Sequence, residues 1–132
     1  MKLRVFDSPQ EWETAAVEAI LDGLEQAALR KEPSWPLHLC LSGGSTPAPI
    51  YALLAKSDRF RELASRHGLE VWVGDEREAA EGSGLRNSEM IAHALADALS
   101  LPGIVFHPWP VGPRETASRH YAELLTTRLG PA

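Results

Sequence analysis

The stretch from Leu37 to Pro47 constrains the fold of this chain most strongly. Its first five residues read as a short apolar strand, and the Ser-Gly-Gly-Ser-Thr run at 42–46 reads as a turn into a helix. Adjacent glycines allow φ above zero and leave room for a ligand oxygen to approach the main chain. Thr46 suits the N-cap of the helix and Pro47 its first residue, where the missing N–H is no loss. Free N–H groups at a helix N-terminus form a ready site for an anion, phosphate above all.

Two interpretations of this turn stay open from its chemistry alone: residues 43–46 bind an anion, or they form a tight strand-to-helix turn that binds nothing. The turn is not a Walker A loop, because no Gly-Lys-Ser/Thr follows the glycines, and it is not the G-x-G-x-x-G dinucleotide fingerprint. Ser45 is not expected to be a nucleophile, since its surroundings differ from the G-x-S-x-G elbow.

Strands and helices alternate along the chain, which is typical of a parallel sheet with helices on both faces, a Rossmann-like α/β fold. Short apolar runs predict strands over residues 3–6, 37–41, 69–74 and 104–107. We expect a single domain over residues 1–132, because the length is too small for two.

Helix-start signals and a 3.6-residue spacing predict the helices. Ser8, Pro9 and Glu11 fit a capping box. The helix that follows has an inward stripe of Trp12, Ala16, Ile20, Leu24 and Ala28. Further helices are expected after Pro47, after a cap at Ser57 or Asp58, after an N-cap at Asn87 or Ser88 as far as about Leu99, and from near Pro113 to a stop at Gly130-Pro131.

Charge and composition argue against several classes of protein. The net charge is −5 and no run of Lys or Arg occurs, which speaks against a nucleic-acid surface. A small anionic ligand stays compatible, since one arginine and a helix N-terminus outweigh a weak overall field. We find no signal-peptide or membrane-span pattern, so we expect no membrane association and a cytoplasmic protein. The one cysteine, Cys40, lies in an apolar run and is expected to be a buried structural thiol.

A second polar segment, Asp75 to Arg77, follows the strand predicted over 69–74. Ligands of α/β folds bind outside the carboxyl ends of the strands, so this segment and the 42–46 turn are expected to meet in one crevice. Arg77 offers a planar cation for phosphate or carboxylate oxygens, and its alternative is an ion pair with the neighbouring acids. Asp75 is a candidate general base if its environment raises its pKa, and its alternative is a helix or turn cap.

The five histidines do not indicate a metal site, because none has a partner at metal-ligand spacing. His38 lies within a predicted strand and His107 near the end of one. These two are the histidines best placed for a functional role, but the sequence assigns them none.

Leu-Ser-Gly-Gly-Ser-Thr-Pro at 41–47 and Trp-Val-Gly-Asp-Glu-Arg at 72–77 together resemble the 6-phosphogluconolactonase family, with looser matches at Asn87, His107-Pro108 and 117–125. The resemblance covers essentially the whole chain. Glucosamine-6-phosphate deaminases share the architecture but typically carry Asp-Glu-Tyr at the second motif, so Arg77 favours the lactonase branch.

The resemblance implies hydrolysis of 6-phosphogluconolactone to 6-phosphogluconate, in the pentose phosphate pathway and without a required cofactor. It also implies that Asp75 lies near the sugar. The residues that it implies for the substrate phosphate are Gly43, Gly44, Ser45, Thr46 and Arg77.

The chain also departs from the family pattern. Arg86 precedes Asn87 where the family usually has a serine. Family members continue with a further strand and a Gly-x-Gly-x-Asp-Gly-His segment, whose histidine is regarded as the catalytic base, and these 132 residues contain no such segment. The chain thus resembles the amino-terminal, phosphate-binding half of the family, a truncated version of its sheet. We expect the resulting open strand edge to be covered by a second copy of the chain, by another polypeptide or by local rearrangement.

Three functions therefore stay open. The first is a lactonase whose base is His38, His107, Asp75 or a group from a partner chain. The second is a non-catalytic module that binds a sugar phosphate. The third is the deaminase branch, which Arg77 disfavours.

Overall fold

Three parallel strands in the order β1-β2-β3 form the centre of the fold. The computed structural model describes residues 2–129. The strands are β1 (Leu37–Leu41), β2 (Leu69–Val73) and β3 (Ile104–His107), in register so that Leu37 and Ile104 both pair with Leu69. The predicted parallel α/β fold is confirmed. The strand expected over residues 3–6 is wrong: this segment joins no sheet, and its Leu3 and Val5 side chains are exposed.

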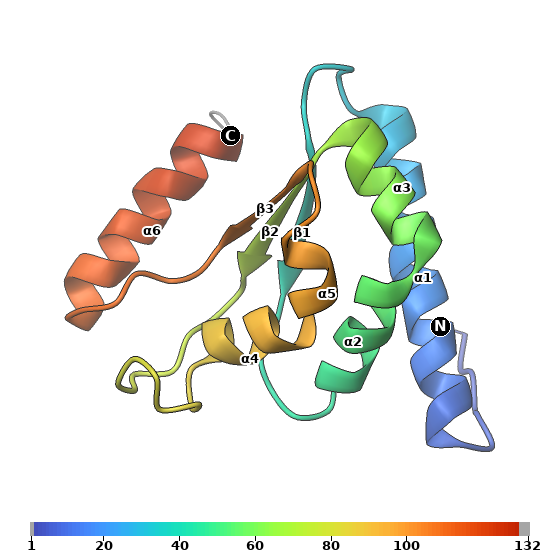
Figure 1. The fold of residues 1–132 in the computed structure, drawn as a ribbon, viewed down its shortest axis with the longest axis horizontal. Coiled ribbons are helices and arrows are strands. Elements are labelled where there is room, and N and C mark those ends of the chain that lie inside the picture. Colours follow the sequence, from blue (N-terminus) through green and yellow to red (C-terminus); the bar gives the residue numbers. More distant parts are fainter. Residues whose placement is uncertain (1, 130–132) are drawn as a thin grey trace.

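Helices cover both faces of the sheet, as Figure 1 shows, but very unequally. Among the helices of residues 2–129, five lie on one face of the sheet and one lies on the other. The five are α1 (Pro9–Arg30), α2 (Ala48–Lys56), α3 (Asp58–His67), α4 (Asn87–Ala94) and α5 (Ala96–Leu99), and the single one is α6 (Arg114–Leu129). Among residues 2–129, no helix is long and apolar enough to cross a membrane.

The apolar core lies between the sheet and the five-helix layer. Alternate residues of β2 point into it, because successive side chains of a strand face opposite sides of the sheet. The largest fully buried side chains of this core are Leu21, Leu54, Phe60, Leu69, Val71, Val73, Ile91 and Leu95.

Several predicted helix boundaries are confirmed and others are displaced. Ser8 and Ser57 are N-caps, each accepting a hydrogen bond from the backbone N–H three residues later. The cap expected at Thr46 is wrong: the N-cap of α2 is Pro47, so the loop after β1 is one residue longer. Of the inward stripe expected on α1, Leu24 is buried and Ala16, Ile20 and Ala28 pack against the core, whereas Trp12 is 39% exposed. The other buried residues of α1 are Val17 and Leu21.

Two further expectations need correction or fall outside the structure. Cys40 is exposed rather than buried. It lies on edge strand β1 and faces away from the five-helix layer, whereas α6 packs beside β2 and β3. The stop expected at Gly130-Pro131 lies outside the described residues.

Candidate functional site

The loops that follow β1 and β2 leave the sheet at the same end, as Figure 1 shows. A hydrogen bond of 2.8 Å from the Gly74 N–H to the Leu41 carbonyl oxygen joins the two loops at the points where they leave the strands. The segments Ser42 to Thr46 and Asp75 to Arg77 therefore begin side by side at the carboxyl ends of two adjacent strands, where ligands of α/β folds bind.

The loop after β1 is open to a ligand. Gly44, Ser45 and Thr46 are exposed, and among the described residues no backbone N–H from Gly43 to Thr46 has a hydrogen-bond acceptor. Gly44 has a φ of 112°, which favours glycine there. The Tyr51 hydroxyl donates a 3.0 Å hydrogen bond to the carbonyl oxygen of Ser42 and so ties the loop to α2.

Asn87, the first residue of α4, joins this loop to Asp75. Its side-chain Nδ2 donates to the Asp75 main-chain oxygen at 3.0 Å and to the Asp75 carboxylate at 3.2 Å. On its other side, the Asn87 amide fills the space in which a Cβ at position 43 would lie. The structure therefore brings Asp75 and Gly43, both predicted from the sequence, against one buried side chain.

Glu76 points inward and caps α4. Its carboxylate accepts hydrogen bonds from the backbone N–H groups of Arg77, Asn87 and Ser88. Burial disfavours its charged form, but the hydrogen bonds from the Ser88 side chain and from these three N–H groups outweigh burial, so the Glu76 pKa lies below its ordinary value. The positive end of the α4 dipole acts in the same direction. The N-cap expected at Asn87 or Ser88 is therefore wrong: Arg86 holds that position and Glu76 supplies the capping oxygens.

Arg86 forms a buried ion pair with Glu76 at 3.4 Å, and the two side chains are 7% and 8% exposed. The same guanidinium donates to the Trp109 carbonyl oxygen at 2.9 Å and to the Pro110 carbonyl oxygen. This pair links the segment after β2 to the segment after β3. Among residues 2–129 the Arg77 guanidinium makes no ion pair, so the buried acid is neutralised by Arg86 rather than by its sequence neighbour.

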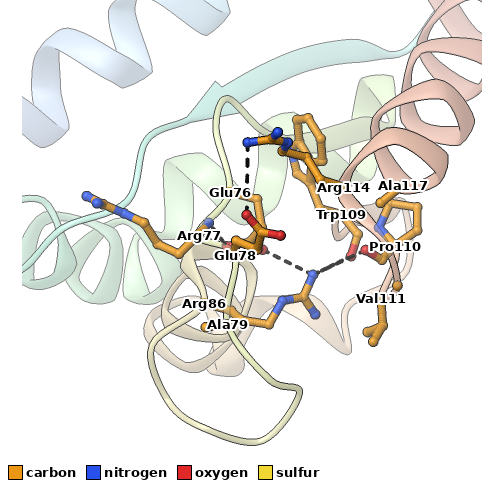
Figure 2. A pocket seen from close by; sticks show the side chains of 11 residues that line it. Glu76, Arg77, Glu78, Ala79, Arg86, Trp109, Pro110, Val111, Arg114 and Ala117 are labelled. Carbon is orange, nitrogen blue, oxygen red and sulfur yellow. Dashed lines mark hydrogen bonds and ion pairs between the residues drawn. The ribbon is translucent and has the colours of Figure 1, made fainter.

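A cavity of about 110 Å³ lies beside this ion pair, as Figure 2 shows. The 43–46 loop does not line it, and the Arg77 side chain extends away from the other labelled residues. The cavity is therefore separate from the predicted anion loop. Its lining residues are Glu76–Ala79, Arg86, Trp109–Gly112, Arg114 and Ala117.

His38, on edge strand β1, and His107, at the end of β3, point to the face of the sheet that carries α6, away from the five-helix layer. His38 Nδ1 accepts a 3.1 Å hydrogen bond from the Trp72 indole, and burial lowers the pKa of His38. His107 stacks on Trp72 and is 2.9 Å from the Glu70 carboxylate. Both rings are thus engaged by neighbours within the sheet. Within the described part of the chain, no group of three or more His, Cys, Asp or Glu side chains is arranged to hold a metal ion.

The roles of Glu76, Arg86 and Asn87 were not anticipated from the sequence. One signal was available for Glu76. Side chains alternate in direction along extended backbone, so the middle residue of the 75–77 segment is expected to face away from its two neighbours. No local signal pairs Arg86 with Glu76, because nine residues lie between them in the sequence.

Comparison with known proteins places these features in a family. The family model for "Glucosamine-6-phosphate isomerases/6-phosphogluconolactonase" matches residues 7–131. The chain is 32% identical over 91 residues to 6-phosphogluconolactonase of Synechocystis sp., a match covering 67% of this chain and 36% of that protein.

Solved structures give the same result at the level of the fold. The 6-phosphogluconolactonase of Trypanosoma cruzi superposes with a TM-score of 0.73 at 25% identity, over 99% of this chain and 52% of that one. The enzyme of Leishmania guyanensis gives a TM-score of 0.59 at 31% identity, over 77% of this chain and 37% of that one. The chain spans between about a third and a half of the length of these relatives.

Proposed function

Because this chain belongs to the glucosamine-6-phosphate isomerase/6-phosphogluconolactonase family, we propose that it binds a sugar phosphate and takes part in the hydrolysis of 6-phosphogluconolactone to 6-phosphogluconate. The observation that carries the proposal is the 43–46 loop at the carboxyl end of β1, next to Asp75 at the end of β2. Its residues 44–46 are exposed, and within residues 2–129 its N–H groups have no acceptor. A pathway role in pentose phosphate metabolism and a cytoplasmic location belong to the same proposal.

In this proposal the phosphate group binds at the loop. Gly43, Gly44, Ser45 and Thr46 offer main-chain N–H groups and two hydroxyls, which suit phosphate oxygens. Arg77 is exposed and unpaired among residues 2–129, so its guanidinium is free to add a charge-assisted bond to the same group. No metal or cofactor is needed for this mode of binding.

Hydrolysis requires a base that activates water for attack on the lactone carbonyl carbon. Of the three candidates from the sequence, Asp75 is the best placed. Asp75 is exposed at the end of β2 beside the loop, whereas the rings of His38 and His107 are bound by Trp72 and Glu70 within the sheet. We therefore assign Asp75 to the sugar end of the ligand, where it holds the ring or the attacking water.

The test is lactone hydrolysis by the purified protein, with freshly generated 6-phosphogluconolactone and subtraction of the spontaneous rate. Binding of 6-phosphogluconate is measured in parallel by calorimetry. We expect Arg77→Ala to weaken that binding by about tenfold or more, the size of a lost hydrogen bond between charged groups.

Arg66→Ala is the matched control for this experiment. Arg66 is also exposed, and its partner is Glu62 on the same helix, α3. The Arg66→Ala variant is expected to bind 6-phosphogluconate as tightly as the unaltered protein. Equal losses in the two variants, or no binding by the unaltered protein, contradict the proposal.

A non-catalytic sugar-phosphate-binding module is the second candidate. The engagement of both His38 and His107 by their neighbours favours it, since neither ring stands beside the loop as a base. Binding of 6-phosphogluconate without turnover selects this candidate. Release of ammonia from glucosamine-6-phosphate selects the deaminase branch instead.

A further inference from the structure

Asn87 touches both halves of the proposed site. Its side-chain amide packs against Gly43 on one side and donates to Asp75 on the other. We propose that Asn87 is a positioning residue that sets the distance between the anion-binding loop and Asp75. This inference rests on the proposed function, because it assumes that one ligand spans the loop and Asp75.

The contact with Gly43 explains why that residue is a glycine. Gly43 does not have a positive φ, unlike Gly44, so backbone conformation does not require glycine there. A Cβ at position 43 would overlap the side-chain amide of Asn87. Since buried side chains are closely packed, the main chain of the loop and the Asn87 amide can approach this closely because position 43 has no side chain.

The contact with Asp75 fixes both its main chain and its carboxylate. The two N–H bonds of Nδ2 are directed to different oxygens of Asp75, at 3.0 and 3.2 Å. Because one bond holds the main-chain oxygen and the other holds a carboxylate oxygen, both the main chain and the side chain of Asp75 are tied to the same amide, which restricts the direction of the carboxylate relative to the loop. That is the arrangement needed to present an oxygen at a fixed distance from a bound phosphate.

Asn87 itself is immobilised from behind. It is 5% exposed, and its backbone N–H donates to the Glu76 carboxylate at the start of α4. Glu76 is in turn paired with Arg86, so the backbone of Asn87 is bound to a buried ion pair and not to a surface loop. A shift of the 43–46 loop relative to Asp75 therefore has to break packing at Asn87.

The first experiment is a double-mutant cycle on equilibrium unfolding. Gly43→Ala and Asn87→Ala are each expected to lower the urea midpoint. The double variant is expected to lose less than the sum of the two single losses, because the smaller side chain at position 87 makes room for the new methyl group. Gly23→Ala is the matched control: a Cβ there meets no atom within 4 Å, so no loss is expected. Additive effects of the two substitutions show that the contact is absent and overturn the proposal.

The second experiment separates positioning from general structural support. Inorganic phosphate and 6-phosphogluconate are titrated into the unaltered protein, Asn87→Ala and Asn87→Leu; the last keeps roughly the size of the side chain, has no donor for Asp75 and adds no charge beside the loop. We expect 6-phosphogluconate affinity to fall about tenfold in both variants, while inorganic phosphate affinity changes less than about threefold, since inorganic phosphate contacts the loop alone.

The outcomes distinguish the two proposals. Equal losses for both ligands, or none for 6-phosphogluconate, overturn the positioning role of Asn87 while leaving the proposed function intact. No binding of either ligand by the unaltered protein overturns the proposed function and the positioning role with it, although the unfolding cycle still decides whether Asn87 and Gly43 are in contact.

Discussion

Replacement of Glu76 by glutamine tests whether the start of α4 and the loop segments around it depend on a buried carboxylate for their stability. The Glu76 carboxylate is 8% exposed, caps the N-terminus of α4 through two of its N–H groups and pairs with Arg86. Glutamine has nearly the same shape but no charge. It keeps one acceptor oxygen and directs an NH₂ group toward donors, so Arg86 is left buried without its counter-ion.

The magnitude follows from these contacts. Removing one member of a buried ion pair costs about 3–5 kcal/mol, and each hydrogen bond to a charged group contributes about 1.5–3 kcal/mol. Because glutamine retains one acceptor, we expect Glu76→Gln to reduce the free energy of unfolding by about 3 kcal/mol. For a domain of this size that corresponds to a decrease of roughly 10 °C in Tm.

Glu78→Gln is the matched control, two residues along the same segment. The Glu78 side chain is 77% exposed and stands 4.0 Å from Arg114. An exposed pair of this kind contributes less than about 1 kcal/mol. Urea unfolding and calorimetry of the two variants provide the comparison. A Glu76→Gln protein as stable as Glu78→Gln refutes the reasoning, because it shows that the buried charge is not needed at the start of α4.

Three further predictions follow from the same contacts. Folding lowers the pKa of Glu76, so its ionised form stabilises the folded protein. This contribution is complete above the pKa of an ordinary glutamate and is lost as the pH falls through the pKa of Glu76 in the folded protein. We therefore expect the free energy of unfolding to depend less steeply on pH in the acid range for Glu76→Gln than for the unaltered protein. The Tyr121 hydroxyl accepts a 2.8 Å hydrogen bond from the Val73 N–H and donates one to the His107 carbonyl oxygen. Tyr121→Phe removes both bonds and is expected to lower the free energy of unfolding, measured in urea, by about 2 kcal/mol. An unchanged free energy of unfolding contradicts this prediction. We also propose that a second copy of the chain pairs with the open edge of β1. Light scattering is then expected to give a dimer, and a short bismaleimide is expected to cross-link the two copies through their exposed Cys40 thiols. A monomer at high concentration contradicts this proposal.

Features fixed by neighbours in the sequence were predictable. The strands at 37–41 and 104–107 have the predicted bounds, and Ser8 and Ser57 cap the helices expected of them. Each of these depends on a short run of residue types, such as an apolar run or a hydroxyl before a helix. The parallel arrangement followed from the alternation of strands and helices alone.

Features fixed by distant residues were not predictable. The segment at 3–6 has the composition of a strand, but a strand forms where a partner edge is available. Cys40 has apolar neighbours in sequence, yet its exposure depends on which strands α6 covers. The cap of α4 comes from Glu76, on a different loop, so the residues at the helix start gave no sign of it.

The three side chains of the 75–77 segment point in alternate directions and are expected to have different roles. Asp75 and Arg77 are exposed, whereas the Glu76 side chain between them is buried, as expected when side chains alternate along extended backbone. If the three residues acted as one binding unit, their substitution would weaken 6-phosphogluconate binding to similar degrees. The geometry predicts instead that Asp75→Asn and Arg77→Ala change ligand affinity with little loss of stability, and that Glu76→Gln lowers stability first. Measuring affinity and unfolding on the same three variants distinguishes the two arrangements, because a shared role moves both quantities together.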